Sequence, residues 1–367
     1  MENLKLTPLH SRHIELGALM SPFAEYDMPI QYKGIIEEHN AVRSACGIFD
    51  VSHMGEVLVR GIEAELFVNR LFTNDITAIS DGKILYGMMC YRHGGVVDDL
   101  LVYRRSRTEF LLVINAANIA KDLNWIRANA AGYAVVVDDM SGHYAQIALQ
   151  GPETESMMRD VVGMDLADMA FYTFADMQYE GADIIVSRTG YTGEDGFEIY
   201  GPAEVIATLW DKFMASGRVE PCGLGCRDTL RFEVGLPLYG DELSDDISPL
   251  EAGLEYFVKL DKPDMFLGCR ALTAQKEEGI KRRLVGLELA DKAIPRHGYE
   301  VVNEADEVVG VITTGYRGIS VDKSIAMAIV DTEYSAVGTQ LKVRIRRKTY
   351  PATIVSKKFY KKSYKKS

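Results

Sequence analysis

A glycine-rich turn between two strand-like runs constrains the middle of this chain more than any other feature. The segment Ser187–Gly201 contains four glycines, and the runs Ile184–Thr189 and Phe197–Tyr200 flank its turn with residues typical of strands. Glycine lets a backbone turn tightly and lie close to a ligand. The pattern therefore predicts a hairpin whose tip, Gly190–Gly196, holds polar groups against a flat polar ligand.

The length and composition of the chain define its broad class. A chain of 367 residues is too long for one compact core, so we expect two or three domains. No run of about 18 apolar residues occurs, so we expect no membrane-spanning segment and no membrane partner. The first residues, Met1–Pro8, lack the apolar core of a signal peptide and the arginines of a transit peptide. We therefore expect a cytoplasmic protein.

Charge and cysteine content argue against a nucleic-acid-binding protein, a secreted protein and a metal-binding protein. The net charge of −12 argues against nucleic acid as a partner. An odd number of cysteines, five, in a long chain without a signal peptide is typical of a reducing compartment. Cys222 and Cys226 are four residues apart, but no second Cys or His pair follows at zinc-like spacing. We therefore expect two small packed residues beside a helix start, and no metal.

Hydrophobic periodicity indicates a mixture of helices and strands in the first 260 residues or so. Helical spacing of apolar residues marks 64–71, 119–126 and 206–213, and Asn118 is expected to cap the second of these helices. Strand patterns mark 100–103 and 110–114. No βαβ repeat with a phosphate-binding loop occurs, so a doubly wound parallel sheet is not expected.

The chain changes character after about Lys262. A charged connector, Gln275–Arg283, precedes six short runs of β-forming residues, and turn residues such as Asn303–Asp306 separate these runs. The pattern predicts a small all-β barrel or sandwich. The six runs are Leu284–Leu289, Tyr299–Val302, Val308–Thr314, Ile325–Val330, Leu341–Ile345 and Ala352–Val355.

A carboxylate pair, Asp98 and Asp99, precedes the expected strand at 100–103. Neighbouring residues of a strand point to opposite faces, so one of the two carboxylates would face inward. A partly buried carboxylate can have a raised pKa and serve in proton transfer. The alternative is a solvated turn between two strands, and the residues alone leave both interpretations open.

Two arginines, Arg227 and Arg231, have i, i+4 spacing and share an apolar arc of a helix with Leu230. Arginines in such a place need partners. Either they form internal salt bridges, or a guanidinium binds a ligand carboxylate in bidentate fashion. A third candidate, His53, is next to Ser52, and a lone histidine in such a context is typical of a packed, hydrogen-bonded residue. The patterns of a serine hydrolase, a dinucleotide fold and a Walker A loop are absent.

Seven segments, in this order along the chain, resemble the glycine-cleavage T-proteins, which are tetrahydrofolate-dependent aminomethyltransferases. The resemblance covers the chain from about Thr7 to Phe359. The segments are Phe23–Tyr32, Gly47–Gly55, Gly94–Leu100, Val113–Asn118, Leu149–Pro152, Tyr191–Glu198 and Arg227–Arg231.

The resemblance implies an α+β fold. It would be a three-domain cloverleaf with a central folate channel, antiparallel sheets with helices, and a C-terminal all-β barrel. The expected division is a discontinuous folate-binding core domain at 1–52 and 152–262, a second α+β domain at 53–151 carrying Asp99, a barrel at 281–360 and a Lys-rich tail at 361–367.

The resemblance also implies roles for single residues. It makes Asp99 the catalytic carboxylate, leaves Asp98 a supporting role, and places Arg227 near the folate. Glu194 and Glu198 compete for the pterin edge, where one carboxylate can accept hydrogen bonds from both an N–H and an amino group. The resemblance favours Glu198. Further folate contacts are implied for Tyr86, Tyr191, Asn115, Tyr239 and Tyr364.

The implied reaction takes an aminomethyl group from the dihydrolipoyl arm of a lipoylated H-protein. Tetrahydrofolate, the cosubstrate, would become 5,10-methylenetetrahydrofolate, with release of ammonia and the dihydrolipoyl carrier. The lysines of 357–367 favour either a disordered solubilising end or a cationic rim that attracts an anionic ligand.

Two alternatives stay open at this point. One is a folate-dependent demethylase of a small methylated amine or sulfonium compound, because Thr313–Ser320 departs from the loop usual in T-proteins. The other is a non-enzymatic folate-binding accessory protein of iron–sulfur maintenance. That branch carries a cysteine motif, and the corresponding segment here, Arg188–Asp195, has no cysteine.

Overall fold

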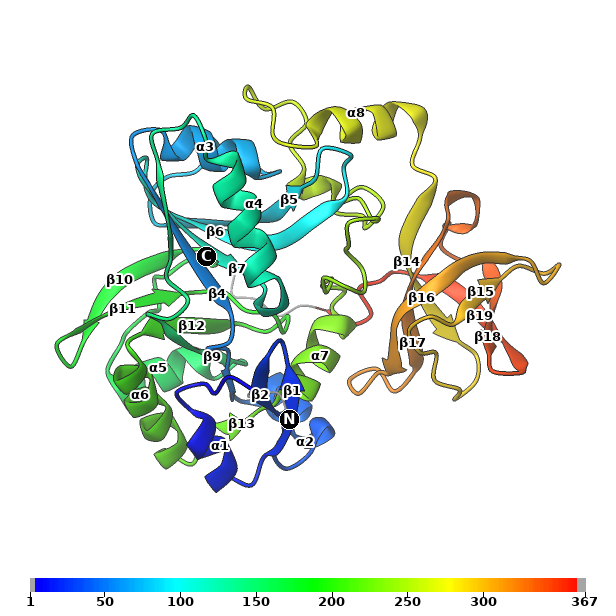
Figure 1. The fold of residues 1–367 in the computed structure, drawn as a ribbon. Helices are drawn as coiled ribbons and strands as arrows, with labels where there is room; N and C mark the ends of the chain where they lie inside the picture. The colour runs from blue at the N-terminus through cyan, green and yellow to red at the C-terminus, as the bar shows by residue number, and fades with distance from the viewer. Residues whose placement is uncertain (1–3, 362–367) are drawn as a thin grey trace.

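The computed structural model describes residues 4–361, in which a five-stranded sheet, a six-stranded sheet and a closed six-stranded barrel are the main units (Figure 1). The five-stranded sheet is antiparallel, with strand order β5-β6-β7-β4-β8. Its strands are β4 (Gly55–Arg60), β5 (Lys83–Cys90), β6 (Val96–Ser106), β7 (Glu109–Ile114) and β8 (Val136–Asp139).

Two helices cover one face of this sheet, α3 (Ala64–Leu71) and α4 (Ile119–Asn129). Their apolar stripes, which the periodicity predicts, pack on the strands, where Phe67 and Ile126 are fully buried. Asn118 is the residue before α4, but the expected side-chain cap is wrong. Its side-chain amide N–H donates to Asp98 Oδ1 at 2.7 Å, a charge-assisted hydrogen bond.

The six-stranded sheet has the order β10-β11-β12-β9-β3-β13, in which only the β3–β13 pair is parallel. Helices α5 (Thr154–Val162) and α6 (Ala203–Ala215) pack on one face. The predicted hairpin is confirmed, with Ile185 opposite Tyr200. The strands are β3 (Gly47–Asp50), β9 (Ala145–Gln150), β10 (Phe174–Tyr179), β11 (Ala182–Ser187), β12 (Gly196–Gly201) and β13 (Glu220–Pro221).

These two sheets face each other through a shared apolar cluster. Ile84 and Tyr103 of one sheet pack there against Phe174 and Tyr200 of the other. The hydroxyls of Tyr103 and Tyr200 are 2.8 Å apart and hydrogen-bonded, so the buried polar ends of both rings are satisfied. The domain boundaries expected at 52/53 and 151/152 stay a prediction. β9, at the end of the 53–151 segment, pairs with β3 and β12 of the six-stranded sheet.

The N-terminal elements and α7 lie beside β3. Residues of α2 and α7 form a cluster with Phe49 and Ala148, and β1 and β2 form a separate hairpin. The bounds are α1 (His10–Glu15), β1 (Leu19–Phe23), β2 (Tyr26–Gln31), α2 (Ile35–Ser44) and α7 (Leu224–Glu233). Single 3-10 turns are η1 (Ile76–Ala78), η2 (Ala116–Asn118), η3 (Glu255–Phe257) and η4 (Thr332–Tyr334).

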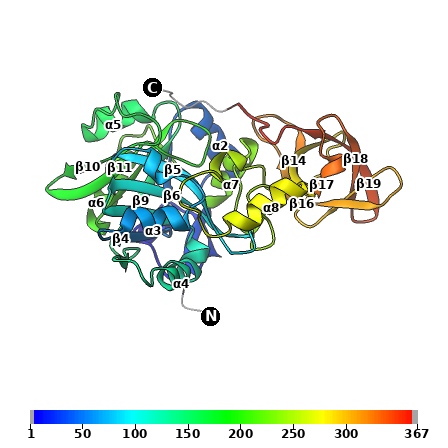
Figure 2. The same ribbon diagram turned by 90° about the horizontal axis from the view of Figure 1, so that it is seen from above.

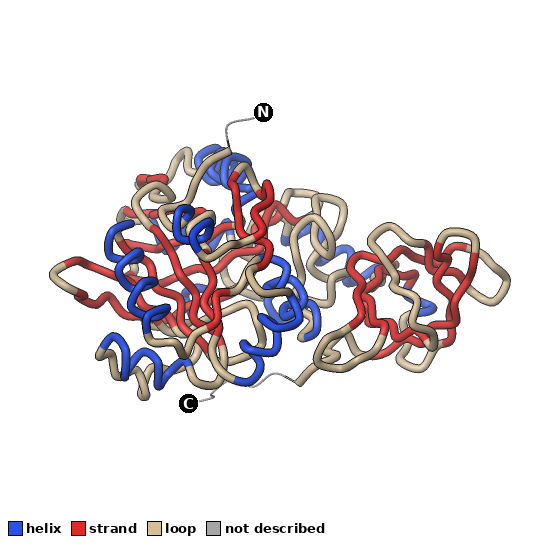
Figure 3. The backbone as a smooth tube through the Cα atoms, turned by 90° about the horizontal axis from the view of Figure 1, so that it is seen from below, coloured by secondary structure: helices blue, strands red, loops and turns tan. Residues whose placement is uncertain are grey.

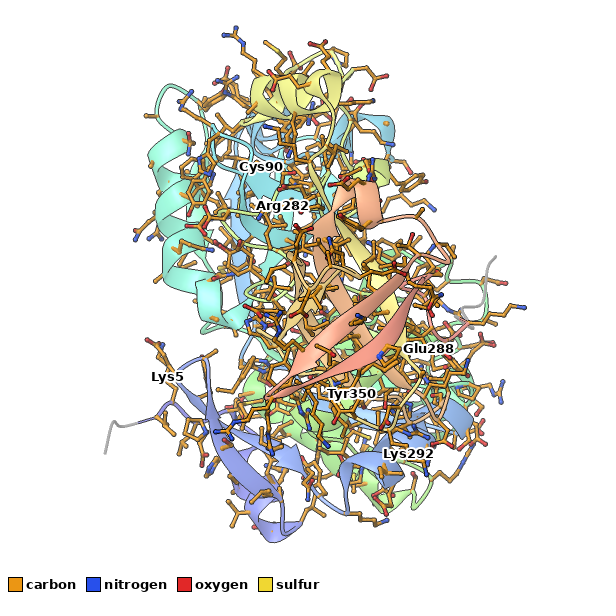
Figure 4. All side chains as sticks on the ribbon, turned by 90° about the vertical axis from the view of Figure 1, so that its right-hand side faces the viewer. Lys5, Cys90, Arg282, Glu288, Lys292 and Tyr350 are labelled. Carbon is orange, nitrogen blue, oxygen red and sulfur yellow. The ribbon has the colours of Figure 1, made fainter. Side chains whose placement is uncertain are left out.

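The C-terminal barrel stands to one side of the other sheets, with α8 (Cys269–Glu278) on the path to it (Figures 2 and 3). All six predicted runs are strands, and they close in the order β14-β17-β16-β15-β18-β19. From the barrel side, Glu288 and Tyr350 lie over its strands (Figure 4). The strands are β14 (Arg282–Leu289), β15 (Glu300–Val302), β16 (Val308–Arg317), β17 (Ser324–Asp331), β18 (Gln340–Ile345) and β19 (Lys348–Val355).

The unusual segment Thr313–Ser320 attaches the barrel to the rest of the chain. Thr313 and Thr314, both buried in β16, each donate a hydrogen bond of 2.6 Å to Glu242 Oε1. The Ser320 amide donates to Glu233 at the end of α7. These inward contacts make the segment part of an internal junction. Within residues 4–361, no helix is both long and apolar enough to cross a membrane.

Candidate active site

A cavity of ≈ 830 Å³ lies where the two sheets meet α7 and the last described residues. This volume is in the range of small-molecule sites. The cavity brings together seven of the eight residues that the sequence analysis assigns to catalysis or folate contact. They are Asp99, Tyr86, Asn115, Tyr191, Glu198, Arg227 and Tyr239. The eighth, Tyr364, lies outside the described residues.

Asp99 presents its carboxylate to this cavity from β6. The Tyr86 hydroxyl donates to Asp99 Oδ2 at 2.9 Å, and the Asn115 amide donates to Oδ1 at 3.0 Å. Burial and the negative charge of Asp98 raise the pKa of Asp99 to about 7, although the two hydrogen bonds act in the opposite direction. A carboxylate with that pKa exchanges protons near neutral pH, which suits it for acid–base work.

Asp98 points away from the cavity and is fully buried. It accepts hydrogen bonds from the Asn115 backbone amide at 3.0 Å, from the Asn115 side chain at 2.9 Å and from Asn118 at 2.7 Å. Strand alternation has therefore separated the two neighbours as expected. The interpretation as a solvated turn is wrong, because both residues lie inside β6.

The two arginines of α7 have different surroundings. Arg231 forms internal salt bridges, with Glu242 and Asp228 both at 2.7 Å. Arg227 lines the cavity, lies over the Tyr191 ring at 5.0 Å, and has an Nη1 atom without a hydrogen-bond partner among residues 4–361. Burial lowers the pKa of Arg227, and the attraction of Glu198 opposes that shift. Internal pairing therefore accounts for Arg231, whereas Arg227 is free to bind a ligand.

Glu194 and Glu198 have different surroundings. Glu198 lines the cavity and accepts a hydrogen bond of 2.5 Å from Thr189. Burial raises the pKa of Glu198, and Thr189 and Arg227 moderate the shift. Glu194 is buried elsewhere, with Arg43 Nη1 at 2.9 Å from its carboxylate. Glu198 is thus the carboxylate placed to accept hydrogen bonds from a ligand in the cavity.

Aromatic side chains form much of the remaining wall. The Tyr86 ring meets the edge of Phe257 at 4.9 Å between centroids. The Tyr191 hydroxyl donates to the carbonyl of Pro237, and the Tyr239 hydroxyl donates to that of Val96 at 3.3 Å. Because their polar ends are held by the protein, these rings offer apolar faces and edges to a flat ligand.

Two lining residues, Phe257 and Lys259, carry no motif that would mark them in the sequence. Phe257 ends η3, and Lys259 lies in the loop that follows. Lys357 and Lys358 also line the cavity, and the lysine-rich composition of 357–367 was the available signal for them. Residues this far apart in the chain meet only because the segment after β19 returns to α7, where the Tyr360 amide donates to the Glu233 carbonyl at 2.7 Å.

His53 is a packed residue, as expected, and lies edge-on to Phe23 with 5.6 Å between centroids. The expected hydrogen bond is wrong for Nδ1, which has no partner within the described part of the chain. Burial lowers the pKa of His53 to about 4. The ring is therefore neutral at physiological pH.

One group in residues 4–361 could hold a metal by its composition, namely Glu38, Cys222 and Cys226. Its possible ligand atoms all lie within 4.8 Å of one another. However, the Glu38 carboxylate already accepts hydrogen bonds from the backbone amides of Tyr32 and Gly223, at 2.6 and 2.8 Å. The thiols of Cys222 and Cys226 are both buried, in agreement with the expectation of two packed residues. The absence of a metal stays a prediction.

Comparisons with known proteins agree with this architecture. The family model described as the GCVT N-terminal domain matches residues 9–262, and the glycine cleavage T-protein C-terminal barrel domain matches residues 282–361. The crystal structure of glycine cleavage system aminomethyltransferase T from Bartonella henselae superposes with a TM-score of 0.94 at 31% identity, over 99% of both chains. The fold and the cavity therefore define a protein of the T-protein class.

Curated relatives narrow the class further. The aminomethyltransferase of Caldanaerobacter subterraneus subsp. tengcongensis is 50% identical over 100% of this chain and 98% of the relative. The aminomethyltransferase of Alkaliphilus oremlandii is 49% identical over the full length of both. The chain belongs to the glycine cleavage T-protein family and is an aminomethyltransferase of the glycine cleavage system. The family, fold class and activity predicted from the sequence are confirmed.

Proposed function

We propose that the cavity binds tetrahydrofolate as cosubstrate and that its pterin ring lies against Glu198, Arg227 and the surrounding tyrosines. The observation that carries this proposal is that the buried carboxylate of Glu198 lines the same cavity as Arg227, whose buried Nη1 atom has no hydrogen-bond partner among residues 4–361. Leaving a charged group unsatisfied is costly, so a ligand that supplies the missing acceptor is stabilised there. The family match implies a folate cosubstrate.

The polar edge of a reduced pterin fits Glu198. The carboxylate uses one lone pair for Thr189 and keeps others for an N–H and an amino group of the ring. Tyr86 and Tyr191 flank the same space with aromatic surface. Directional hydrogen bonds at one edge and apolar contact on the faces would fix the ring in one orientation.

The opposite end of the ligand would meet a cationic rim. Lys259, Lys357 and Lys358 all line the cavity, and Lys358 is exposed. A folate carries its glutamyl carboxylates at the end remote from the pterin. These lysines would attract that end against the net negative charge of the chain.

Asp99 would act on the one-carbon unit. We propose that the donor is the aminomethyl group on the dihydrolipoyl arm of a lipoylated H-protein, and that the products are 5,10-methylenetetrahydrofolate, ammonia and the dihydrolipoyl carrier. The Asp99 carboxylate can accept or return a proton near neutral pH and stabilise positive charge that develops on the carbon–nitrogen unit. Tyr86 and Asn115 hold it in place for this task. A cytoplasmic location is expected with these partners.

Calorimetry with tetrahydrofolate tests the binding step. We expect stoichiometric binding at micromolar concentrations without added metal or nucleotide. No heat under these conditions would contradict a folate site. The donor is tested by supplying either aminomethylated H-protein or a free methylated amine. Folate-dependent ammonia release from the H-protein alone is expected, whereas turnover of the free amine alone would favour a demethylase.

A further inference from the structure

A third acidic group, the buried Asp122, lies behind Asp98 and Asp99. Asp122 is on α4, its residue is fully buried, and neither carboxyl oxygen has a hydrogen-bond donor among residues 4–361. An ionised carboxylate without donors in the interior of a protein is strongly unfavourable. The environment of Asp122 therefore favours its neutral, protonated form.

Asp122 faces Asp98. Burial, and then the charge and hydrogen-bonding contact of Asp98, raise the pKa of Asp122 far above its ordinary value. Two carboxyl groups in contact cannot both be ionised, because like charges at this range repel and neither could donate a hydrogen bond. One proton must lie between them.

The position of that proton follows from the hydrogen bonds. Asp98 accepts from the Asn115 backbone, the Asn115 side chain and Asn118, and these three donors stabilise an anion. Asp122 receives none within the described part of the chain. Asp98 is thus the carboxylate of the pair, and Asp122 is the carboxylic acid.

The neighbouring charges do not change this assignment. Lys121 Nζ is 3.9 Å from Asp122 Oδ1, but it donates to the Val97 carbonyl and lies over the Tyr239 ring. Asp99 also raises the pKa of Asp122, and Asp245 acts on Lys121. Tyr91 and Tyr239 border the same cluster. None of these four groups is a cation that would favour an ionised Asp122.

We propose that Asp122 is a positioning residue that holds the proton of an Asp98–Asp122 acid–carboxylate pair and thereby keeps a single negative charge behind Asp99. The effect reaches the cavity through Asn115, whose amide donates to Asp98 Oδ1 at 2.9 Å and to Asp99 Oδ1 at 3.0 Å. When Asp122 is neutral, the pKa of Asp99 is raised by one buried anion, Asp98, instead of two. Asn115 then stays oriented between Asp98 and Asp99. The link to turnover rests on the proposed role of Asp99.

Infrared difference spectroscopy tests the proton directly. At pH 9, where Asp99 is ionised, protein labelled with carboxyl-¹³C aspartate should retain an isotope-sensitive carbonyl band of a protonated acid. Asp122→Asn should abolish this band, and the matched control Asp138→Asn, at an exposed salt bridge with Arg60, should retain it. Absence of the band in the parent protein, or its persistence in Asp122→Asn, would overturn the proposal.

A pH profile tests the consequence for Asp99. The amide that Asp122→Asn introduces is neutral and can still donate a hydrogen bond to Asp98. In Asp122→Asn, the apparent pKa of the acid limb of kcat/KM should therefore stay within about 0.3 pH units of the parent value. In Asp98→Asn, which removes the charge, this apparent pKa should fall by about one unit or more. Equal shifts in both variants would show that Asp122 is ionised and would overturn the proposal. If the infrared band is present but no variant shows an acid limb, the placement of the proton on Asp122 is upheld and the role of Asp99 is refuted.

Discussion

Arg227 and Arg231 lie one turn apart on α7, yet of these two only Arg231 forms salt bridges with acids among residues 4–361. Glu242 and Asp228 each lie 2.7 Å from its guanidinium. Arg227 keeps a buried Nη1 without a partner among residues 4–361, at the wall of the cavity. The same residue type on one helix face therefore serves the internal junction at one position and is proposed to bind the ligand at the other.

The first prediction contrasts these two arginines. Arg227→Ala should weaken tetrahydrofolate binding by about 1.5–3 kcal/mol, the range for a hydrogen bond to a charged group. Calorimetry measures this loss, and the thermal stability of the ligand-free protein should hardly change. Arg231→Ala should instead cost about 3–5 kcal/mol of stability, because it leaves Glu242 buried and unpaired. A large loss of ligand-free stability in Arg227→Ala would show that Arg227 is structural.

The second prediction concerns Asp99, the carboxylate proposed as catalytic. Asn has nearly the shape of Asp but cannot accept a proton or carry charge. Asp99→Asn should lower turnover by about two to four orders of magnitude while tetrahydrofolate affinity changes little. Asp98→Asn should lower turnover less, because its side chain points away from the cavity. Steady-state formation of methylenetetrahydrofolate measures both variants. An active Asp99→Asn enzyme beside an inactive Asp98→Asn enzyme would reverse the assignment.

The third prediction is a pH dependence. The pKa of Asp99 is raised to about 7 by burial and by Asp98, so the free enzyme carries a protonated Asp99 below that pH. If the carboxylate form is the active one, kcat/KM should rise about tenfold per pH unit below about 7 and level off above it. The acid limb should vanish in Asp99→Asn. A flat profile between pH 5.5 and 8 in the parent enzyme is incompatible with the assignment.

The same shift predicts the sign of a stability change. A raised pKa means that the folded chain binds the Asp99 proton more tightly than the unfolded chain does. This contribution to the free energy of unfolding is fully present below the ordinary Asp value of 3.8 and is lost as pH rises through about 7. Denaturation measures the free energy of unfolding of the parent and of Asp99→Asn across this range. Relative to the variant, the parent should become less stable as pH rises.

The fourth prediction compares two glutamates of the hairpin. Glu198→Gln should weaken tetrahydrofolate binding by about 1.5–3 kcal/mol, since an amide presents one oxygen acceptor and a repelling amino group to the pterin edge. Glu194→Gln should leave ligand affinity unchanged and reduce stability, because it removes one of the two carboxylates that pair with Arg43. Calorimetry and thermal denaturation of both variants separate the two effects. Equal losses of ligand affinity would show that the cavity does not distinguish the two positions.

Much of the fold could be predicted from the residues because it depends on local patterns. The period of apolar residues marked α3 and the six barrel strands, and the glycines of 190–196 marked the β11–β12 hairpin. These signals survive in the structure because backbone propensity and one buried face agree along each element. The pairing of β9 with β3 and β12 was not visible in this way, since sheet partners distant in sequence leave no periodic trace.

For the candidate site, too, some features followed from the sequence and others only from the tertiary structure. The sequence by itself determined which residue types stand at positions 99, 198 and 227, and the resemblance to T-proteins attached roles to them. Only the tertiary structure decided that Arg231 is paired internally, that Lys357 reaches the cavity, and that Asp122 lies against Asp98. Burial and charge depend on which distant segments meet. A side chain's protonation and its freedom to bind are therefore properties of the packed chain, which a linear pattern does not encode.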